Sequence, residues 1–444
     1  MRNFLRSRRG SVAFATVVAL VPLIGALALG GEAGTWYVTK QHAQNAADAA
    51  AYSGAVQQAC LNSPPCLVTN TVDYRAKQFA AQHSFCNTGD GTAYPGSRCL
   101  SSLPSGTTQT VTIASLTSWP GASGTNFVQA TITQQQPVYL ATVLGMSNVN
   151  IGATAVAAVQ GLPKSPCALS LTTISFQGSP NINAPNCGMA ANGTAANALN
   201  FTGGGMTMNL GSLSAAGGCT GASQFCNSAY TYMPPVNNPF SVLDAVTLPT
   251  LANCSTLGFS DGSLTAYSAT KTATTGPCTN NNLDLKGNNT ITLTGGVYFI
   301  SGTMSLKGTT AIAGTALFIL LPGASFSMKG TGNITVTGNA SVSTSQLPTV
   351  LQPYANLFAN MVLYYRSSTA VQIGGNSNIT LNGNMYLPNA DVTFQGNPTV
   401  ALSGGACGEL IAKSIAFNGN ATFDSTGCSS ATKLPSTQYV RLVQ

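Results

Sequence analysis

The chain has 444 residues, of which only 6% are charged and 47 are glycine. Globular proteins carry about 25% charged residues, so hydroxyl and amide side chains must supply most of the polar surface here, as is common in exported β-proteins. The net charge of +7 is uneven, because four of the 17 basic residues lie in residues 1–9 and the remainder holds 13 basic against 10 acidic residues. No dense basic patch remains, which excludes nucleic acid as an expected partner.

Residues 10–31 form an uncharged run between Arg9 and Glu32. As a helix this run is about 33 Å long, enough to cross a hydrocarbon core of about 30 Å. All the arginines before it lie on one side, so the positive-inside rule predicts a cytoplasmic tip (1–9), one pass through the inner membrane, and a periplasmic or extracellular body. The alternative is a signal peptide cleaved after Ala26-Leu27-Ala28, which also exports the body.

The helical pattern continues through residues 32–58. Its small residues share a face that permits close packing on a partner membrane helix, although an Ala-rich helix of high propensity explains the same pattern. They are Ala43, Ala46, Ala47, Ala50, Ala51 and Gly54.

Several of these N-terminal features occur together. The segment Arg8-Arg9-Gly10-Ser11-Val12-Ala13, the apolar run with Pro22, the pair Trp36-Tyr37 and the segment Gln44–Ala51 resemble the N-terminal module of TadG-like (TadE/TadG-type) proteins. The resemblance covers about residues 1–160. It implies a bacterial cell-envelope protein that assists assembly of Flp (Tad) pili, with other Tad pilus-assembly membrane proteins as partners.

Residues 59–160 are expected to form a disulfide-containing α+β module. Strands are predicted at 108–114 and 127–133, residues 134–137 are predicted as a connection, and 138–144 as a short helix, an order similar to the unit that follows the anchor in that family. The D-x-S-x-S signature of the family's metal-dependent adhesion domain is missing from the sequence. Ala15 stands where a processed prepilin carries glutamate, so prepilin processing is not expected.

The twelve cysteines are an even number in an exported chain, which favours disulfides. Pairing between sequence neighbours is the simplest hypothesis. Zinc is disfavoured, because no Cys-x-x-Cys occurs and His42 and His83 are the only histidines. The expected couples are Cys60/Cys66, Cys86/Cys99, Cys167/Cys187, Cys219/Cys226, Cys254/Cys278 and Cys407/Cys428.

Residues 161–433 contain a repeat in which an apolar residue, any residue and glycine precede a short alternating strand. A period of about 22 residues with Gly and Asn turns predicts a right-handed parallel β-helix, a solenoid whose stacked coils bury one side chain in two. A β-sandwich is the alternative, with hairpins spaced by about 8–12 residues. Weaker copies begin at Phe176 and Phe201, and residues 434–444 are expected to be a tail. The repeated glycines are Gly287, Gly308, Gly330, Gly374, Gly396 and Gly419.

Two further features fit stacked coils. The couples Cys167/Cys187 and Cys407/Cys428 each span nearly one repeat, so they are expected to join neighbouring coils near the two ends of the solenoid. Asparagines close to the turns are expected to form hydrogen-bonded ladders. They are Asn289, Asn333, Asn378, Asn397 and Asn420.

No catalytic constellation accompanies the repeat. The acids beyond residue 161 are not adjacent. Asp391 is 18 residues from Glu409 and 33 from Asp424, which matches neither one coil nor two, and no nucleophile elbow or Walker loop occurs. We therefore expect no enzyme, no cofactor and no metal, with a polysaccharide-processing enzyme as a weaker alternative. The acids are Asp244, Asp261, Asp284, Asp391, Glu409 and Asp424.

Lys286, Lys307 and Lys329 recur at intervals of one repeat and predict a basic stripe. The simplest interpretation is solvated turn lysines; the alternative is contact with an anionic glycan or a membrane surface. The whole sequence predicts a membrane-anchored, exported accessory or structural protein of Flp pilus assembly, with the β-helix as an interaction or adhesion surface. A membrane-tethered carbohydrate-binding protein unrelated to pili is the alternative.

Overall fold

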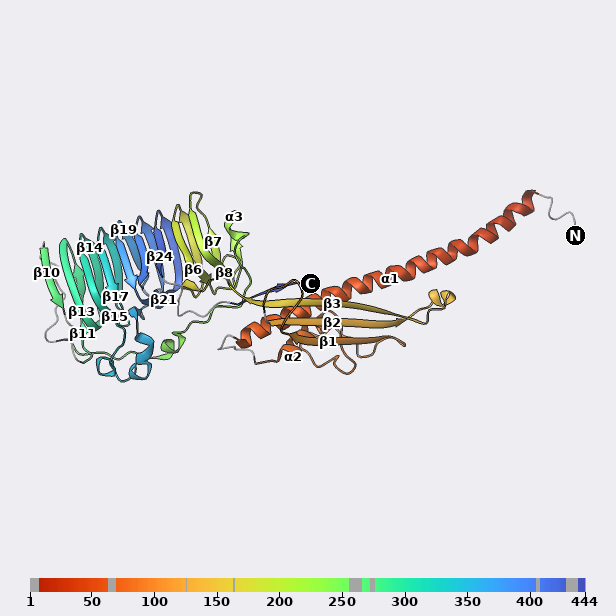
Figure 1. Ribbon diagram of the computed structural model, residues 1–444, viewed down its shortest axis with the longest axis horizontal. Helices are drawn as coiled ribbons and strands as arrows, with labels where there is room; N and C mark the ends of the chain where they lie inside the picture. Colours follow the sequence, from red (N-terminus) through yellow and green to blue (C-terminus); the bar gives the residue numbers. More distant parts are fainter. Residues whose placement is uncertain are drawn as a thin grey trace. The chain divides into compact units, whose positions relative to one another are not determined.

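The computed structural model describes residues 8–62, 69–124, 126–162, 164–254, 266–271, 276–404, 408–428 and 438–443. The protein is mainly β with one long N-terminal helix (Figure 1). It divides into two compact units, one made of residues 1–160 with 439–444 and the other of residues 161–438.

One continuous helix, α1 (Arg8–Asn62), includes both the apolar run and the Ala-rich segment. Its C-terminal half is buried against α2 (Val72–Gln82) and the sheet of the first unit. Small side chains are required there, because a Cβ on Gly54 would lie 2.9 Å from Val128 Cγ1 and 3.1 Å from Ala76 Cβ. The Thr71 hydroxyl caps α2 by accepting a hydrogen bond from Tyr74 N at 3.1 Å.

The sheet of the first unit has four strands in the order β1-β2-β3-β25. β1 (Thr108–Leu116), β2 (Asn126–Pro137) and β3 (Asn148–Gly161) pair antiparallel, and β25 (Gln438–Leu442) follows β3. Alternate side chains of the strands pack with the alanines of α1 in one core.

Two local predictions were wrong in this unit. Residues 134–137 are not a connection, because Gln134, Gln135 and Gln136 continue β2 and pair with β3. The predicted helix 138–144 is a 3-10 turn, η1 (Ala141–Leu144), at the tip of the β2–β3 hairpin. Four residues cannot form the amphipathic face that stabilises an α-helix.

The second unit is a β-solenoid of about 10 turns with about 23 residues per turn. The described strand pairs in its sheet are all parallel, which excludes the β-sandwich; the hand of the coil stays a prediction. Its strands are β4 (Pro166–Ser170), β5 (Ile174–Gly178), β6 (Asn181–Ala191), β7 (Leu199–Phe201), β8 (Thr207–Ala215), β9 (Cys219–Thr220), β10 (Ala266–Lys271), β11 (Thr279–Asn280), β12 (Leu283–Leu285), β13 (Asn288–Ile300), β14 (Thr303–Gly308), β15 (Ala311–Leu320), β16 (Ser325–Gly330), β17 (Asn333–Thr337), β18 (Met361–Tyr365), β19 (Val371–Gly375), β20 (Asn378–Asn382), β21 (Asn384–Gly396), β22 (Thr399–Gly404), β23 (Leu410–Gly419) and β24 (Thr422–Cys428).

Equivalent positions of successive coils stack in register. Leu306 pairs with Met328, and Ile312 pairs with Ile334, so buried apolar columns run along the solenoid axis. The turn glycines stack too, with one correction to the predicted series. Gly375, not Gly374, pairs with Gly396 and has a left-handed φ of 74°, because Ile373 rather than its neighbour continues the apolar column.

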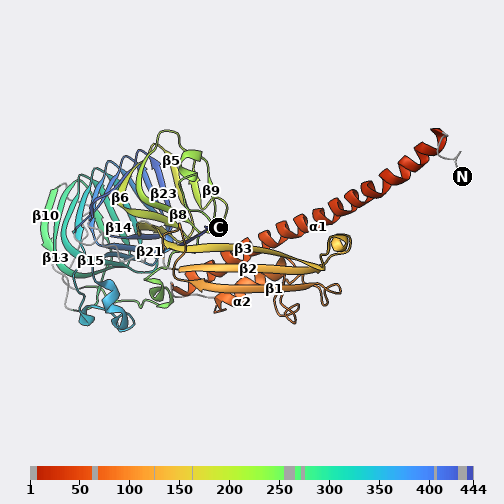
Figure 2. The same ribbon diagram turned by 45° about the vertical axis from the view of Figure 1, so that its right-hand side comes forward.

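The order of the coils in space differs from their order in the sequence. β23 pairs with β4 and β5, and β24 pairs with β6, so the coils of residues 166–220 stack onto the last coil of the chain. Figures 1 and 2 show the yellow-green strands β6 and β8 beside the blue strands of the C-terminal coils. The chain therefore enters and leaves the solenoid at neighbouring coils, and the solenoid is inserted between β3 and β25 of the first unit.

Residues 221–254 connect one end of the solenoid to the other. The segment begins with α3 (Ser223–Cys226) and includes η2 (Ser241–Ala245). Phe240 and Leu243 are buried in an outer apolar cluster with Tyr364 and Tyr386 of the solenoid. The insertion with η3 (Thr344–Gln346) and η4 (Gln352–Phe358), which leads into the buried strand β18, joins the same cluster.

In the described parts of the chain, four disulfides join cysteines that are neighbours in the sequence. Cys219–Cys226 and Cys254–Cys278 lie beside β9 and β11, at the two ends of the coil stack. Cys167–Cys187 joins neighbouring coils but lies in the interior of the stack, beside β23, so its predicted place near an end is wrong. Cys86–Cys99 lies in the first unit. Cys66 and Cys407 are outside the described residues, and with them the couples Cys60/Cys66 and Cys407/Cys428.

Candidate functional site

The three repeat lysines lie side by side on one edge of the solenoid. Lys307 and Lys329 are register partners, and the pairing of Leu285 with Leu306 places Lys286 next to Lys307. All three are exposed. Because neighbouring strands are about 4.8 Å apart, the stripe carries three positive charges within about 10 Å of backbone.

The turn beside the lysines fixes this arrangement. Gly308 adopts a φ of 75°, and a Cβ there would lie only 2.9 Å from Gly287 N. The coils therefore stack backbone on backbone at the turn, and the preceding lysines must lie next to one another. Lys286 Nζ is 3.4 Å from Asp284, whereas in the described parts of the chain Lys307 and Lys329 have no acidic partner. The stripe is thus suited to an anionic ligand.

The same column continues with amide side chains. Gly374 occupies the position after Lys329, and Gln395, Asn418 and Gln177 then follow at equivalent positions of the next coils in the stack. Beside them Asn420 donates to Asn397, and Asn397 donates to Asn376, both at 3.2 Å. This edge of the solenoid therefore presents a row of cations followed by rows of amides, a surface that fits an extended polar polymer.

The predicted asparagine ladder is partly right. Asn397 and Asn420 belong to it, and Asn376 was missed because the prediction placed the turn glycine one residue early. Asn333 and Asn378 are exposed register partners on the paired strands β17 and β20, apart from this ladder. Asn289 is buried, and its side chain donates to the Lys286 carbonyl.

The acids of the second unit have separate local environments. Asp391 accepts a hydrogen bond of 2.6 Å from Ser414 Oγ and lies 3.3 Å from Lys413 Nζ. Asp424 accepts from Thr426, Glu409 is buried, and Asp261 lies outside the described residues. Among the described residues no group of three His, Cys, Asp or Glu side chains is placed to hold a metal.

Asp244 belongs to a polar cluster that the sequence did not predict. Its carboxylate accepts a hydrogen bond of 2.7 Å from Tyr386 Oη and lies 3.4 Å from Arg366 Nη1. Asn238 donates to Tyr386 Oη at 2.9 Å, and Tyr364 Oη donates to the Leu243 carbonyl at 3.2 Å.

Burial raises the pKa of the Asp244 carboxyl, although the hydrogen bond from Tyr386 and the charge of Arg366 act in the opposite direction. Burial also raises the pKa of the Tyr364 and Tyr386 hydroxyls. The cluster fastens the connection 221–254 to the flank of the solenoid. No sequence motif links its two parts, because Asn238 and Asp244 are more than a hundred residues from Tyr364, Arg366 and Tyr386.

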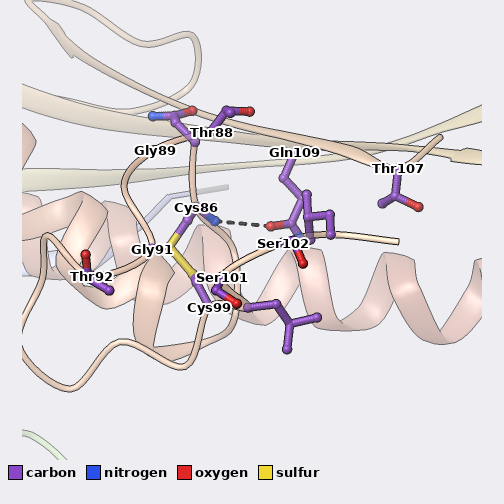
Figure 3. A pocket seen from close by; sticks show the side chains of 13 residues that line it. Cys86, Thr88, Gly89, Gly91, Thr92, Cys99, Ser101, Ser102, Thr107 and Gln109 are labelled. Atoms are coloured by element: carbon purple, nitrogen blue, oxygen red, sulfur yellow. Dashed lines mark hydrogen bonds between the residues drawn. A yellow bond between two sulfur atoms is a disulfide. The ribbon is translucent and has the colours of Figure 1, made fainter. Parts of the chain in front are cut away.

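A polar cavity of about 360 Å³ lies in the first unit (Figure 3). The Cys86–Cys99 disulfide forms one wall, and Gln109 Oε1 accepts a hydrogen bond from Cys86 N at 3.3 Å. The rest of its lining is made of glycine, hydroxyl and amide residues with Leu100 and Leu103, and it contains no acid, base or free thiol. We assign it no chemistry.

The Ala-rich face of α1 is not free for a partner helix. Ala43, Ala47 and Ala51 are fully buried against the sheet and α2 of their own unit, so the expectation that this face packs with partner membrane helices is wrong. The exposed apolar surface lies earlier, at Val18, Leu23 and Ile24. By its length and composition, α1 is able to cross a membrane.

Comparison with known proteins finds a similarity over most of this helix. No curated protein and no solved structure matches the chain. The family model Tad, described as Flp pilus-assembly TadE/G-like, matches residues 10–57. The matched segment comprises the apolar run and most of the Ala-rich half of α1, and the predicted resemblance of the N-terminal module is confirmed over these residues.

Proposed function

We propose that this protein is a membrane-anchored accessory protein of Flp (Tad) pilus assembly whose exported solenoid serves as an interaction or adhesion surface. The TadE/G-like match over residues 10–57 carries the proposal, because it coincides with the helix able to cross a membrane. The protein binds and positions its partners in pilus assembly, and it catalyses no reaction. Its body lies on the far side of the inner membrane from the arginine-rich tip.

Two structural features support a docking role. Most of the described side chains in residues 18–38 of α1 are exposed, so a partner membrane protein has an apolar helix surface to contact. The solenoid is held by two chain connections, since the chain leaves the first sheet after β3 and returns to it as β25.

Site-specific photo-crosslinking in cells tests the docking role. A photoreactive residue replaces Leu23 in the exposed apolar part of α1, and a matched control replaces Thr117, which is exposed directly after β1. We expect the probe at 23 to yield an adduct with another membrane protein of the Tad machinery and the probe at 117 to yield none. Adducts with unrelated membrane proteins only would contradict the proposal.

The lysine stripe favours a second candidate function, a membrane-tethered protein that binds an anionic glycan. Lys307 and Lys329 are neighbours in register without an acidic partner among the described residues, and amide rows follow them. Retained pili in a deletion strain, together with salt-dependent binding of an acidic polysaccharide by the purified protein, would favour this candidate over the first.

A further inference from the structure

The tip of the β2–β3 hairpin, residues 138–147, is bound to the end of the apolar run of α1. The Glu32 carboxylate accepts hydrogen bonds from three consecutive backbone amides, Tyr139 N at 2.7 Å, Leu140 N at 3.1 Å and Ala141 N at 2.9 Å. Glu32 is the first charged residue after the uncharged residues 10–31. The tip therefore lies at the level where α1 leaves the predicted membrane span.

The tip exposes large apolar side chains. Tyr139 is 74% exposed, Leu140 45% and Met146 38%, and on the helix nearby Tyr37 is 67% exposed. No charged residue occurs between Arg98 and Lys164. Single exposed apolar residues are ordinary, but three in one uncharged tip beside a membrane-span candidate mark an interaction surface.

Part of the tip's backbone has hydrogen-bond partners within the protein. Glu32 satisfies three amides, Gly145 N donates to the Thr142 carbonyl at 2.9 Å, and Thr142 Oγ1 donates to the Tyr139 carbonyl at 2.8 Å. Irregular backbone enters an apolar phase only when its polar groups have such partners. The tip meets this requirement at the amides of residues 139–141 and 145.

We propose that residues 138–147 insert into the lipid bilayer that α1 crosses, on the side where residue 32 emerges. The inference rests on the proposed membrane anchoring. An open cavity of about 500 Å³ lies between helix and tip, where Trp36, Tyr139 and Leu140 offer lipid chains apolar surface beside the polar Glu32 and Gln136. The contact is apolar, so zwitterionic phosphatidylcholine is a sufficient partner. A second membrane contact fixes the tilt and rotation of the first unit, which one helix leaves free.

Fluorescence quenching by lipids tests the insertion. The full-length chain is reconstituted in nanodiscs of phosphatidylcholine with brominated acyl chains, in a background in which both native tryptophans, Trp36 and Trp119, are replaced by phenylalanine. Leu140→Trp then reports the tip. Thr117→Trp is the matched control, because it lies at the opposite end of the same sheet, about 30 Å away along the strands.

We expect at least about a twofold loss of emission from tryptophan at 140 relative to non-brominated lipid, and no loss at 117. A chain that keeps Trp36 alone reports the anchor. Quenched Trp36 with unquenched tryptophan at 140 would overturn the insertion and leave the anchor intact; unquenched emission at both positions would overturn both proposals. In the Leu140→Trp chain, Glu32→Gln should reduce quenching at 140, because its amide nitrogen cannot accept from the tip.

Discussion

The ring of Phe417 stacks on the ring of Phe176, with 5.5 Å between centroids and 10° between planes. Phe417 belongs to the last complete coil of the chain and Phe176 to the first. Phe394 and Phe201 extend the stack on either side, at 5.0 and 4.8 Å. The column continues without a break across the point where the sequence order of the coils restarts, so the two parts of the solenoid share one core.

Removing a ring from this junction should destabilise the whole solenoid. Phe176→Ala leaves a cavity between two stacked rings in a fully buried site, and we expect a loss of about 3–5 kcal/mol in the free energy of unfolding. Phe225→Ala is the matched control, since Phe225 is only partly buried at the end of the stack and should cost about half as much or less. Urea denaturation with the disulfides intact measures both; equal losses would contradict the shared core.

The glycine turns offer a separate test of backbone stacking. Gly308 and Gly323 both have left-handed φ values, 75° and 89°, but a Cβ meets backbone at 2.9 Å only at Gly308 and has open space at Gly323. Each alanine variant suffers the strain of about 1–2 kcal/mol for a left-handed residue. Gly308→Ala should cost at least about 1 kcal/mol more, from overpacking. Similar unfolding midpoints for the two variants would show that the coils do not stack closely there.

The lysine stripe should govern binding of acidic polysaccharide, if the solenoid binds one. The double variant Lys307→Gln, Lys329→Gln removes two adjacent charges, and we expect roughly a tenfold loss of affinity for polygalacturonate at low salt. Lys413→Gln is the control, because this exposed lysine is paired with Asp391 and lies apart from the stripe. An equal loss in the control, measured by calorimetry, would assign the binding to net charge rather than to the stripe.

The Asp244 cluster should give the solenoid a measurable pH dependence. The pKa of Asp244 is raised in the folded chain from 3.8, so its contribution to stability is present at low pH and is lost as the pH rises through the folded pKa. The Asp244→Asn variant has no carboxyl group at this position, so its stability does not include this loss. The melting temperature of the variant relative to the unmodified chain should therefore rise between about pH 3 and about pH 7. A fall over this range would mean that the ion pair with Arg366 outweighs burial.

The periodic part of the fold was predictable because each coil has its own short sequence pattern. Each coil repeats an apolar residue, an exposed residue and a glycine, and this pattern placed Lys307 beside Lys329 before the structure did. The stacking of Phe176 on Phe417 was not predictable in this way. Similar side chains form the same buried column whether or not the neighbouring coils are consecutive in the sequence. No local sequence signal distinguishes these two arrangements.

The contacts between distant segments were missed for the same reason. Tyr386 and Asp244 meet only because the connection 221–254 runs along the solenoid, and Glu32 meets Tyr139 only because the hairpin tip reaches α1. The Ala-rich face of α1 was recognised as a packing surface. Its partner was misjudged, because small residues fit a strand of the same unit as well as a second helix.

The number of Flp pili on cells that lack this protein tests the central claim most directly. Electron microscopy should show few or no pili in a deletion strain, and the full-length chain supplied in trans should restore them. A chain whose residues 10–31 are replaced by an unrelated membrane-spanning segment should be exported but restore fewer pili, because it lacks the matched TadE/G-like segment. Normal piliation and surface attachment in the deletion strain would contradict the account.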